Sequence, residues 1–231
     1  MFGKKNDFLR SYAITQVVAS AQSSNSAAAN INKLKKVLII FIRNPVLGKV
    51  KTRLARTMGV EEALRIYRLL LEKTRAAVMG TTCERWLFYS DGVPTAETEW
   101  PRHLFVEHNQ REGDLGLRME DAFDRAFRGG AERVVIVGSD CPELSSHILE
   151  QAFAALDNVD FVVGPASDGG YYLLGMKVFE PAVFSGMVWS TEEVLAQTLE
   201  RVRAMGKSYL LLPTLADIDE ASDWEAYQQR T

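Results

Sequence analysis

Two uninterrupted apolar segments constrain the fold of this chain more than any other feature of its sequence. They are VLIIFI at residues 37–42 and VVIVG at residues 134–138. A strand with one face in water alternates apolar and polar residues, whereas a strand covered on both faces is apolar throughout. Both segments therefore predict strands of a parallel sheet that is buried on its two faces.

Strand-like and helix-like segments alternate along the rest of the chain. Helices are predicted over about 61–79 and 115–128, where apolar residues recur at helical spacing, and over about 148–156. Further strands are predicted at 86–89, 104–106, 161–163, 171–175 and 209–212. Two pairs spaced as capping boxes, Ser190 with Glu193 and Ser222 with Glu225, predict the starts of two more helices. This alternation predicts a doubly wound α/β fold, a three-layer α/β/α sandwich with a mostly parallel, Rossmann-like sheet.

The composition excludes several classes of protein. The 231 residues are 47% hydrophobic and 25% charged, which excludes a collagen-like, disordered or disulfide-rich secreted chain. Lys and Arg total 27 against 30 Asp and Glu, so we expect no nucleic-acid partner. No segment approaches the length of a membrane span. Two cysteines, Cys83 and Cys141, suit a reducing compartment, so we expect a cytoplasmic protein.

The first 34 residues differ from the rest. A basic start leads into a segment rich in Ser, Asn and Ala, which is typical of an arm or linker. Ser11, Thr15 and Gln16 interrupt what would be the apolar centre of a secretion signal, so that interpretation is disfavoured. We expect residues 1–34 to be an N-terminal arm and residues 35–231 to form a single domain.

The loop after the first strand is strongly basic. In an open α/β sheet, ligands bind at the carboxyl ends of the strands. Here RNPVLGKVKTRLA leads into a helix, and its cations are Arg43, Lys49, Lys51, Arg53 and Arg56. Cations around a turn that feeds a helix start favour phosphate binding. A solvated basic helix start is the alternative, and the loop lacks the glycine and hydroxyl positions of a Walker A motif.

Two further loops carry acids directly after predicted strands. In GSDCPEL, Asp140 can hold Mg²⁺ against substrate phosphates, or else cap the next helix, a task for which Ser145 or Ser146 is better placed. Cys141 has no partner histidine nearby except His147, so we interpret it as a packed residue. In GPASDGGYYLLG, the glycines after Asp168 let the backbone approach a ligand. A plain hairpin turn is the alternative there.

Weaker signals complete the set. GDLGLRM at residues 113–119 has a flexible backbone that suits a base or ribose, although Asp114 is equally suited to capping the helix. Near the C-terminus, ADIDEASDW offers Asp217 and Asp219 as a second source of carboxylates. The absence of GxGxxG, GxSxG, HExxH and CxxC argues against a dinucleotide dehydrogenase, a serine hydrolase and a zinc enzyme.

Taken in order, these motifs resemble a known family. KTRL, GDLGLRM, GSDCPEL, DGGYYLLG and DID are similar to those of the uncharacterised DUF2064 family, which has the GT-A (nucleotide-diphospho-sugar transferase) fold. The resemblance covers roughly residues 36–224. It implies a nucleotide site in the N-terminal half, a metal-bound diphosphate at Asp140, and an acceptor or sugar site around residues 168–172.

The residues that match the family's motifs receive roles from this resemblance. The nucleotide-binding set is Arg43, Gly48, Lys51, Arg53, Gly113, Asp114, Gly116 and Ser139, and the acceptor-binding set is Asp168, Gly169, Gly170 and Tyr171. The catalytic set is Lys51, Arg53 and Asp168. The chain lacks the second acid of a DxD metal motif, because Gly138 and Pro142 flank Asp140 at that spacing. A late aspartate completes the metal site in nucleotidyltransferases of this fold, which implies Asp219, or Asp217, as the second ligand of Mg²⁺ or Mn²⁺.

The function implied is that of a metal-dependent glycosyltransferase with a nucleotide-diphospho-sugar donor and a small-molecule acceptor. One alternative is a nucleotidyltransferase that moves NMP from an NTP to a small phosphorylated or carboxylated acceptor. Another is a nucleotide-binding module without catalysis. The sequence leaves the base, the sugar, the acceptor and the oligomeric state open.

Overall fold

The apolar segment at residues 37–42 forms the central strand β1 (Lys36–Ile42), and its side chains alternate between two hydrophobic cores. Leu38 and Ile40 pack on one face of the sheet, whereas Val37 and Ile39 pack on the other. All four side chains are fully buried. Residues 37–40 are apolar because both faces of the sheet are covered there, whereas Phe41, near the end of the strand, is only half-buried.

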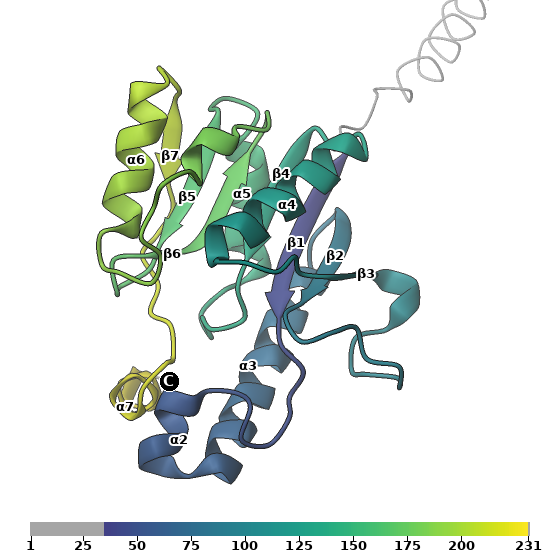
Figure 1. Ribbon diagram of the computed structural model, residues 1–231, viewed down its shortest axis with the longest axis vertical. Helices are drawn as coiled ribbons and strands as arrows, with labels where there is room; N and C mark the ends of the chain where they lie inside the picture. The colour runs from purple at the N-terminus through teal and green to yellow at the C-terminus, as the bar shows by residue number, and fades with distance from the viewer. Residues whose placement is uncertain (1–34, 231) are drawn as a thin grey trace, which may run out of the picture. The chain divides into compact units, whose positions relative to one another are not determined.

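The computed structural model describes residues 35–230, so the predicted N-terminal arm lies outside the described residues (Figure 1). Seven strands form one sheet in the order β3-β2-β1-β4-β6-β5-β7. Besides β1, they are β2 (Glu84–Tyr89), β3 (Val106–Asn109), β4 (Arg133–Val137), β5 (Phe161–Pro165), β6 (Tyr171–Met176) and β7 (Tyr209–Leu211). β6 runs antiparallel to β4 and β5, and the other pairs are parallel.

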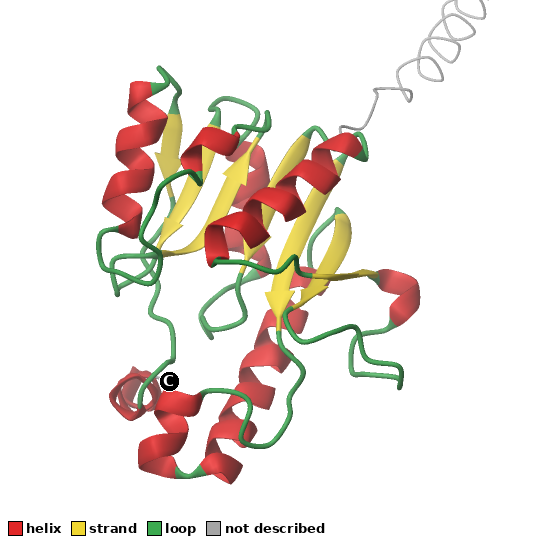
Figure 2. Cartoon of the chain, viewed as in Figure 1, coloured by secondary structure: helices red, strands yellow, loops and turns green. Residues whose placement is uncertain are grey.

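Helices cover both faces of the sheet, which confirms the predicted three-layer fold (Figure 2). They are α2 (Thr52–Met58), α3 (Val60–Met79), α4 (Leu115–Arg128), α5 (Ser146–Ala155), α6 (Val194–Ala204) and α7 (Ala221–Arg230). α3 and α5 pack on the face that Ile40 joins, through side chains such as Leu71 and Phe153. α4 and α6 pack on the other face, through side chains such as Phe123 and Val202. Within residues 35–230, no helix is long and apolar enough to cross a membrane.

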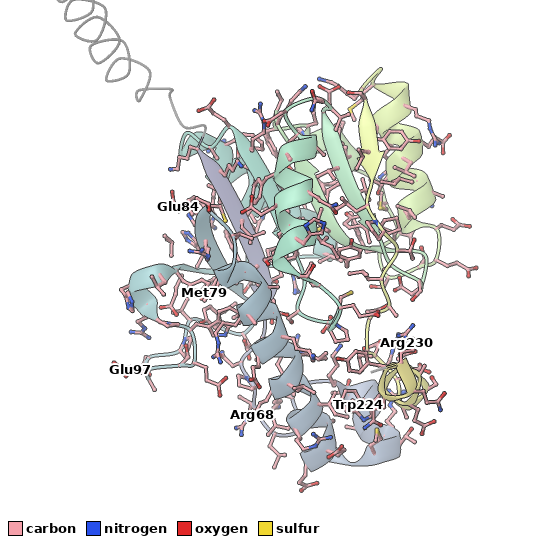
Figure 3. The ribbon with its side chains drawn as sticks, turned by 180° about the vertical axis from the view of Figure 1, so that it is seen from behind. Arg68, Met79, Glu84, Glu97, Trp224 and Arg230 are labelled. Atoms are coloured by element: carbon pink, nitrogen blue, oxygen red, sulfur yellow. The ribbon has the colours of Figure 1, made fainter. Side chains whose placement is uncertain are left out.

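A third, smaller cluster lies away from the sheet and joins three helices. Trp224 and Tyr227 of α7 pack with Leu54 of α2 and with Ile66 and Leu70 of α3. Figure 3 shows Trp224 on the side of α7 that is turned toward the other helices. This cluster fixes the C-terminal segment beside the basic loop that follows β1.

Three local predictions need correction. β3 begins at residue 106 instead of 104, because Arg102–Leu104 form a 3₁₀ turn. The Ser190 capping box is wrong, since Ser190 has a left-handed φ of 64° and α6 begins after Glu193 with no side-chain cap. The Ser222 box is also wrong, because α7 already begins at residue 221. There the Asp223 carboxylate accepts hydrogen bonds from the two N–H groups that precede the helix.

Truncating the centre of β1 tests the two-core arrangement. Ile40→Ala should lower the free energy of unfolding by about 2–5 kcal/mol, because it leaves a cavity beneath α3 and α5. Val188→Ala, at a side chain 68% exposed, should change it by less than about 0.5 kcal/mol. Urea unfolding measures both values. Equal losses in the two variants would contradict the buried position of β1.

Candidate functional site

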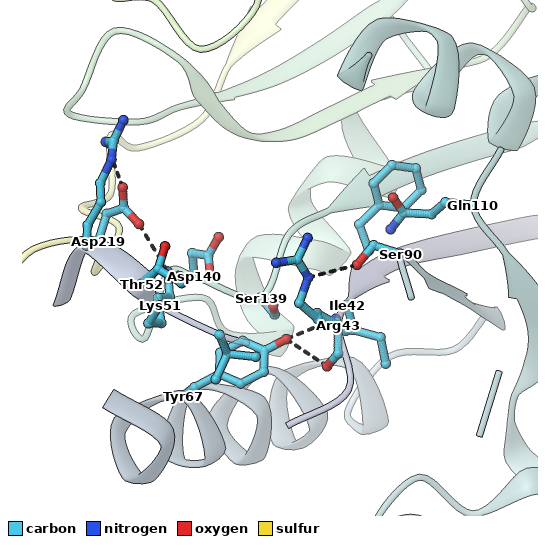
Figure 4. Close-up of a pocket in the computed structure, with 13 residues that line it drawn as sticks. Ile42, Arg43, Lys51, Thr52, Tyr67, Ser90, Gln110, Ser139, Asp140 and Asp219 are labelled. Atoms are coloured by element: carbon cyan, nitrogen blue, oxygen red, sulfur yellow. Dashed lines mark hydrogen bonds and ion pairs between the residues drawn. The ribbon is translucent and has the colours of Figure 1, made fainter. Parts of the chain in front are cut away.

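A cavity of 320 Å³ opens at the carboxyl ends of β1, β2, β3 and β4. We call it the first cavity (Figure 4). Its lining residues follow these strands or belong to the segments packed against them: Phe41, Ile42, Arg43, Val50, Lys51, Thr52, Arg53, Tyr67, Ser90, Gln110, Ser139, Asp140 and Asp219. A cavity therefore lies at the edge of the sheet where the sequence predicted ligand binding.

Arg43 is held in place at the start of the basic loop. Its Nε donates to Ser90 Oγ at 3.1 Å and its Nη1 donates to the Lys49 carbonyl at 3.1 Å. Tyr67 of α3 holds its main chain, accepting from the Arg43 N–H and donating to the Arg43 carbonyl, both at 2.9 Å. Burial raises the pKa of Tyr67 to about 12, so the phenol stays protonated and able to donate. The guanidinium thus faces the first cavity from a fixed position.

Lys51 joins two acids that are distant in sequence. Its side chain is only 7% exposed, and Nζ lies 2.7 Å from Asp140 Oδ1 and 3.8 Å from Asp219 Oδ1. Arg53 pairs with the second of these acids through Nη1 and Oδ2, at 2.9 Å. The main chain adds a further link, because the Ile218 N–H donates to the Asp140 carbonyl at 2.9 Å. The loops after β1, β4 and β7 meet at this ammonium group.

A second cavity of 510 Å³ adjoins the first, and both are lined by Arg53, Asp140 and Asp219. The other lining residues are Leu115, Ala166, Asp168, Gly170, Tyr171, Trp189, Ser190, Thr191, Glu192, Val194 and Asp217. The charged groups that line the second cavity are therefore five carboxylates and the guanidinium group of Arg53. Burial, reinforced by the charge of Asp168, raises the pKa of Asp217.

The predicted turn at residues 168–170 lines this second cavity. The Gly170 N–H donates to Asp168 Oδ1 at 2.9 Å, which closes the turn. Gly169 has a φ of 89°, and a Cβ there would overlap the Glu192 backbone, so only glycine fits. Tyr171 contributes to the lining, but its hydroxyl donates to Met119 Sδ at 3.7 Å, and burial raises the pKa of that hydroxyl.

The segment at residues 113–116 shows the helix-capping alternative that the sequence left open for Asp114. Gly113, Asp114 and Gly116 are not among the residues that line the first cavity, and neither is Gly48 of the basic loop. The Asp114 carboxylate caps α4 by accepting from the Leu117 N–H at 2.9 Å. A Cβ on Gly116 would overlap the indole of Trp189, which explains the glycine by packing. The structure thus shows capping and packing roles for this segment, and no contact with the first cavity.

The two shared carboxylates fit one kind of metal environment. Within residues 35–230, no three His, Cys, Asp or Glu side chains are grouped to hold a metal ion by themselves. Asp140 and Asp219 nevertheless contact one ammonium group together. Mg²⁺ is usually bound by one or two carboxylates together with substrate phosphates. The pair suits an ion shared with a phosphate, and its second carboxylate comes from the distant C-terminal segment.

Sequence reasoning missed several lining residues. Ser90 and Gln110 directly follow β2 and β3, and this position at the carboxyl end of a strand was a signal that could have identified them. Tyr67 lies within the helix predicted over about 61–79, and nothing local showed that its hydroxyl reaches Arg43. Trp189 carries no local signal either. Cys141, in contrast, is buried as predicted, and burial raises the pKa of its thiol.

The fold and site define a class of protein, and comparison with known proteins identifies its family. The fold is shared with a protein described as a nucleotide-diphospho-sugar transferase and with a cytidylyltransferase. The chain belongs to the family described as "Uncharacterized protein conserved in bacteria (DUF2064)", whose model matches residues 73–191. The resemblance seen in the motifs is thereby confirmed. No curated protein matches the sequence.

Solved structures support the family and the fold. A Desulfovibrio desulfuricans G20 protein described as a "putative nucleotide-diphospho-sugar transferase" is 30% identical, with a TM-score of 0.78 over 85% of this chain and 87% of that one. Rv0371c of Mycobacterium tuberculosis H37Rv is 12% identical, with a TM-score of 0.54 over 85% and 99%. A cytidylyltransferase of Leptospira borgpetersenii is 15% identical, with a TM-score of 0.50 over 84% and 85%. The last two likenesses show the fold alone.

The Trp189 contact gives Gly116→Ala an unusual expected effect. Replacing a helical glycine with alanine normally stabilises a protein by about 1 kcal/mol. Here the new methyl group displaces the indole, so we expect a lower free energy of unfolding in urea. Gly138→Ala is the matched control, because a Cβ at Gly138 meets nothing within 4 Å. A stabilised Gly116→Ala protein would contradict the packing role.

Proposed function

We propose that this protein is a metal-dependent glycosyltransferase that uses a nucleotide-diphospho-sugar donor and a small-molecule acceptor. One observation carries the proposal: two cavities of different character share the residues Arg53, Asp140 and Asp219. A transfer reaction needs donor and acceptor side by side, with the charged leaving group at their junction. The likeness to the Desulfovibrio protein supports the same class of donor.

The first cavity suits the nucleotide. Arg43, Lys51 and Arg53 all line it and provide three positive charges for the two phosphates. Charge-assisted hydrogen bonds from such groups are short and strong, and arginine matches phosphate with two parallel donors. Ser139, also in the lining, adds a hydroxyl. In the proposed complex, Lys51 donates to a phosphate oxygen and no longer neutralises the two carboxylates.

Asp140 and Asp219 would hold Mg²⁺ or Mn²⁺. The bound ion would supply charge neutralisation to the leaving diphosphate. This assignment rests on the shared contact of both carboxylates with Lys51 and on the oxygen chemistry that these ions prefer.

Asp168 is the proposed base in the second cavity. The bond between the anomeric carbon and the diphosphate oxygen breaks, and the acceptor oxygen forms a new bond to that carbon. The acceptor's proton passes to the Asp168 carboxylate, which is exposed and lines the cavity. General-base help of this kind contributes roughly 10²–10⁴-fold to a rate. Gly169, Gly170 and the ring of Tyr171 would shape the acceptor site beside it.

Nucleotidyl transfer is the second candidate, and the fold shared with a cytidylyltransferase supports it. The cations and the carboxylate pair would serve that reaction equally well. The charge of the second cavity favours glycosyl transfer, because five carboxylates and one arginine line it. A phosphorylated or carboxylated acceptor would meet repulsion there, whereas a neutral hydroxyl acceptor would not.

Both free thiols, Cys83 and Cys141, agree with a protein of the cytoplasm.

Two lysines of one loop allow a matched test of the nucleotide site. Lys51→Met should weaken the binding of nucleoside diphosphates by about 10–100-fold, because a charge-assisted hydrogen bond contributes roughly 1.5–3 kcal/mol. Lys49→Met removes the same charge from an exposed side chain outside the cavity lining. It should change the affinity by less than about threefold. Titration calorimetry measures both, and equal losses would show only a general charge effect.

Asp140→Asn tests the metal. A panel of NTPs, NDPs and NDP-sugars, each with and without Mg²⁺ or Mn²⁺, should raise the melting temperature of the wild type most when the ion is present. A ligand at a hundred times its Kd adds roughly 2.7 kcal/mol of stability. Asp140→Asn should lose the metal-dependent part of this shift, whereas the remote Asp157→Asn should keep it. An unchanged metal response in Asp140→Asn would contradict the assignment.

The released product separates the candidate reactions. The wild type with an NDP-sugar should release NDP, slowly to water and faster to an acceptor, and a chelator should stop the release. Pyrophosphate from an NTP would establish nucleotidyl transfer instead. Nucleotide binding with no turnover of any donor would establish the non-catalytic module.

A further inference from the structure

Most charged residues of the first cavity lie at one of its ends, and their position indicates where a bound nucleobase would lie. Figure 4 shows Lys51, Asp140 and Asp219 at one end, and Ser90 and Gln110 at the opposite end. Lys51, Arg53 and the carboxylate pair fix the phosphates at the first of these ends, and Arg43, bonded to Ser90, lies between them and the opposite end. A nucleotide is an extended molecule with its phosphates at one terminus, so its base must approach Gln110.

Gln110 has a fixed orientation. Its main-chain N–H donates to the Tyr89 carbonyl at 2.9 Å, and its side-chain Nε2 donates to the Phe88 carbonyl at 3.0 Å. A backbone carbonyl only accepts, so the NH₂ half of the amide must face Phe88. Turning the amide over would place two acceptors against each other and lose this hydrogen bond.

The orientation leaves Oε1 as a free acceptor. This atom has no hydrogen-bond partner among residues 35–230, and it is not among the buried unsatisfied atoms found there. Because Gln110 lines the first cavity, the open acceptor belongs to that cavity. Phe41 is also part of the lining and offers an aromatic surface for the plane of a base.

We propose that Gln110 selects nucleobases that carry an exocyclic amino group, at C4 of a pyrimidine or C6 of a purine. Cytosine and adenine present an N–H at this position and donate to Oε1. Uracil and guanine present a keto oxygen there, which would face another acceptor without a proton between them. The inference rests on the proposed function, since it requires the nucleotide to occupy the first cavity with its phosphates at Lys51.

Two pairs of nucleoside diphosphates test the proposal. CDP and UDP differ in the amino or keto group at C4 and in the proton on N3, and ADP and GDP differ at C6, in the proton on N1 and in the additional 2-amino group of guanine. In titration calorimetry with Mg²⁺, the wild type should bind CDP at least about tenfold more tightly than UDP, and ADP at least about tenfold more tightly than GDP. One good hydrogen bond, together with relief from two opposed acceptors, corresponds to roughly this ratio.

Gln110→Leu should bring both ratios close to one by weakening CDP and ADP. Gln151→Leu makes the same change at an exposed position on α5, outside both cavities, and should keep the wild-type ratios. The wild-type ratios test the proposal even if the Gln110 variant does not fold. Keto nucleotides bound as tightly as amino nucleotides, or a preference that persists in folded Gln110→Leu, would overturn it.

The outcomes also separate this inference from the proposed function. Tight, metal-dependent binding of all four diphosphates without preference would refute the role of Gln110 and leave the nucleotide site standing. Binding of none of them would refute both.

Discussion

The ion pair between Lys51 and Asp140 is the interaction on which the arrangement of the site depends. The lysine is almost entirely buried, and its ammonium group also contacts Asp219. Two acids from different loops would repel each other at this distance without a cation between them. The lysine therefore holds the loops after β1, β4 and β7 together, and any ligand that replaces it must provide positive charge at the same place.

Charge divides the site into two halves with different chemistry. The first cavity brings together Arg43, Lys51 and Arg53, which suits a diphosphate, whereas the charged residues of the second are five carboxylates and one arginine. Arg53, Asp140 and Asp219 belong to both. Under the proposed function, such a division would place an anionic donor on one side and a neutral acceptor on the other, with the shared residues at the point of transfer.

The sequence predicted the fold well because its strongest signals come from burial. β1 and β4 are apolar on both faces, and the alternation around them leaves few topologies. Failures occurred where a contact between distant segments decides the structure. The end of β3 was placed at residue 106 instead of 109, so Gln110 was not seen as the residue after a strand. Nothing in the local sequence predicted that Gly116 packs against Trp189, which lies more than 70 residues further along the chain.

A crystal structure with a nucleoside diphosphate and Mn²⁺ would test the central claim most directly. The account predicts phosphates bound by Arg43, Lys51 and Arg53, with an anomalous manganese peak about 2.1 Å from carboxylate oxygens of Asp140 and Asp219. It also predicts that the Lys51 ammonium leaves Asp140 and contacts a phosphate. A nucleotide bound elsewhere, with the Lys51–Asp140 pair intact, would contradict it.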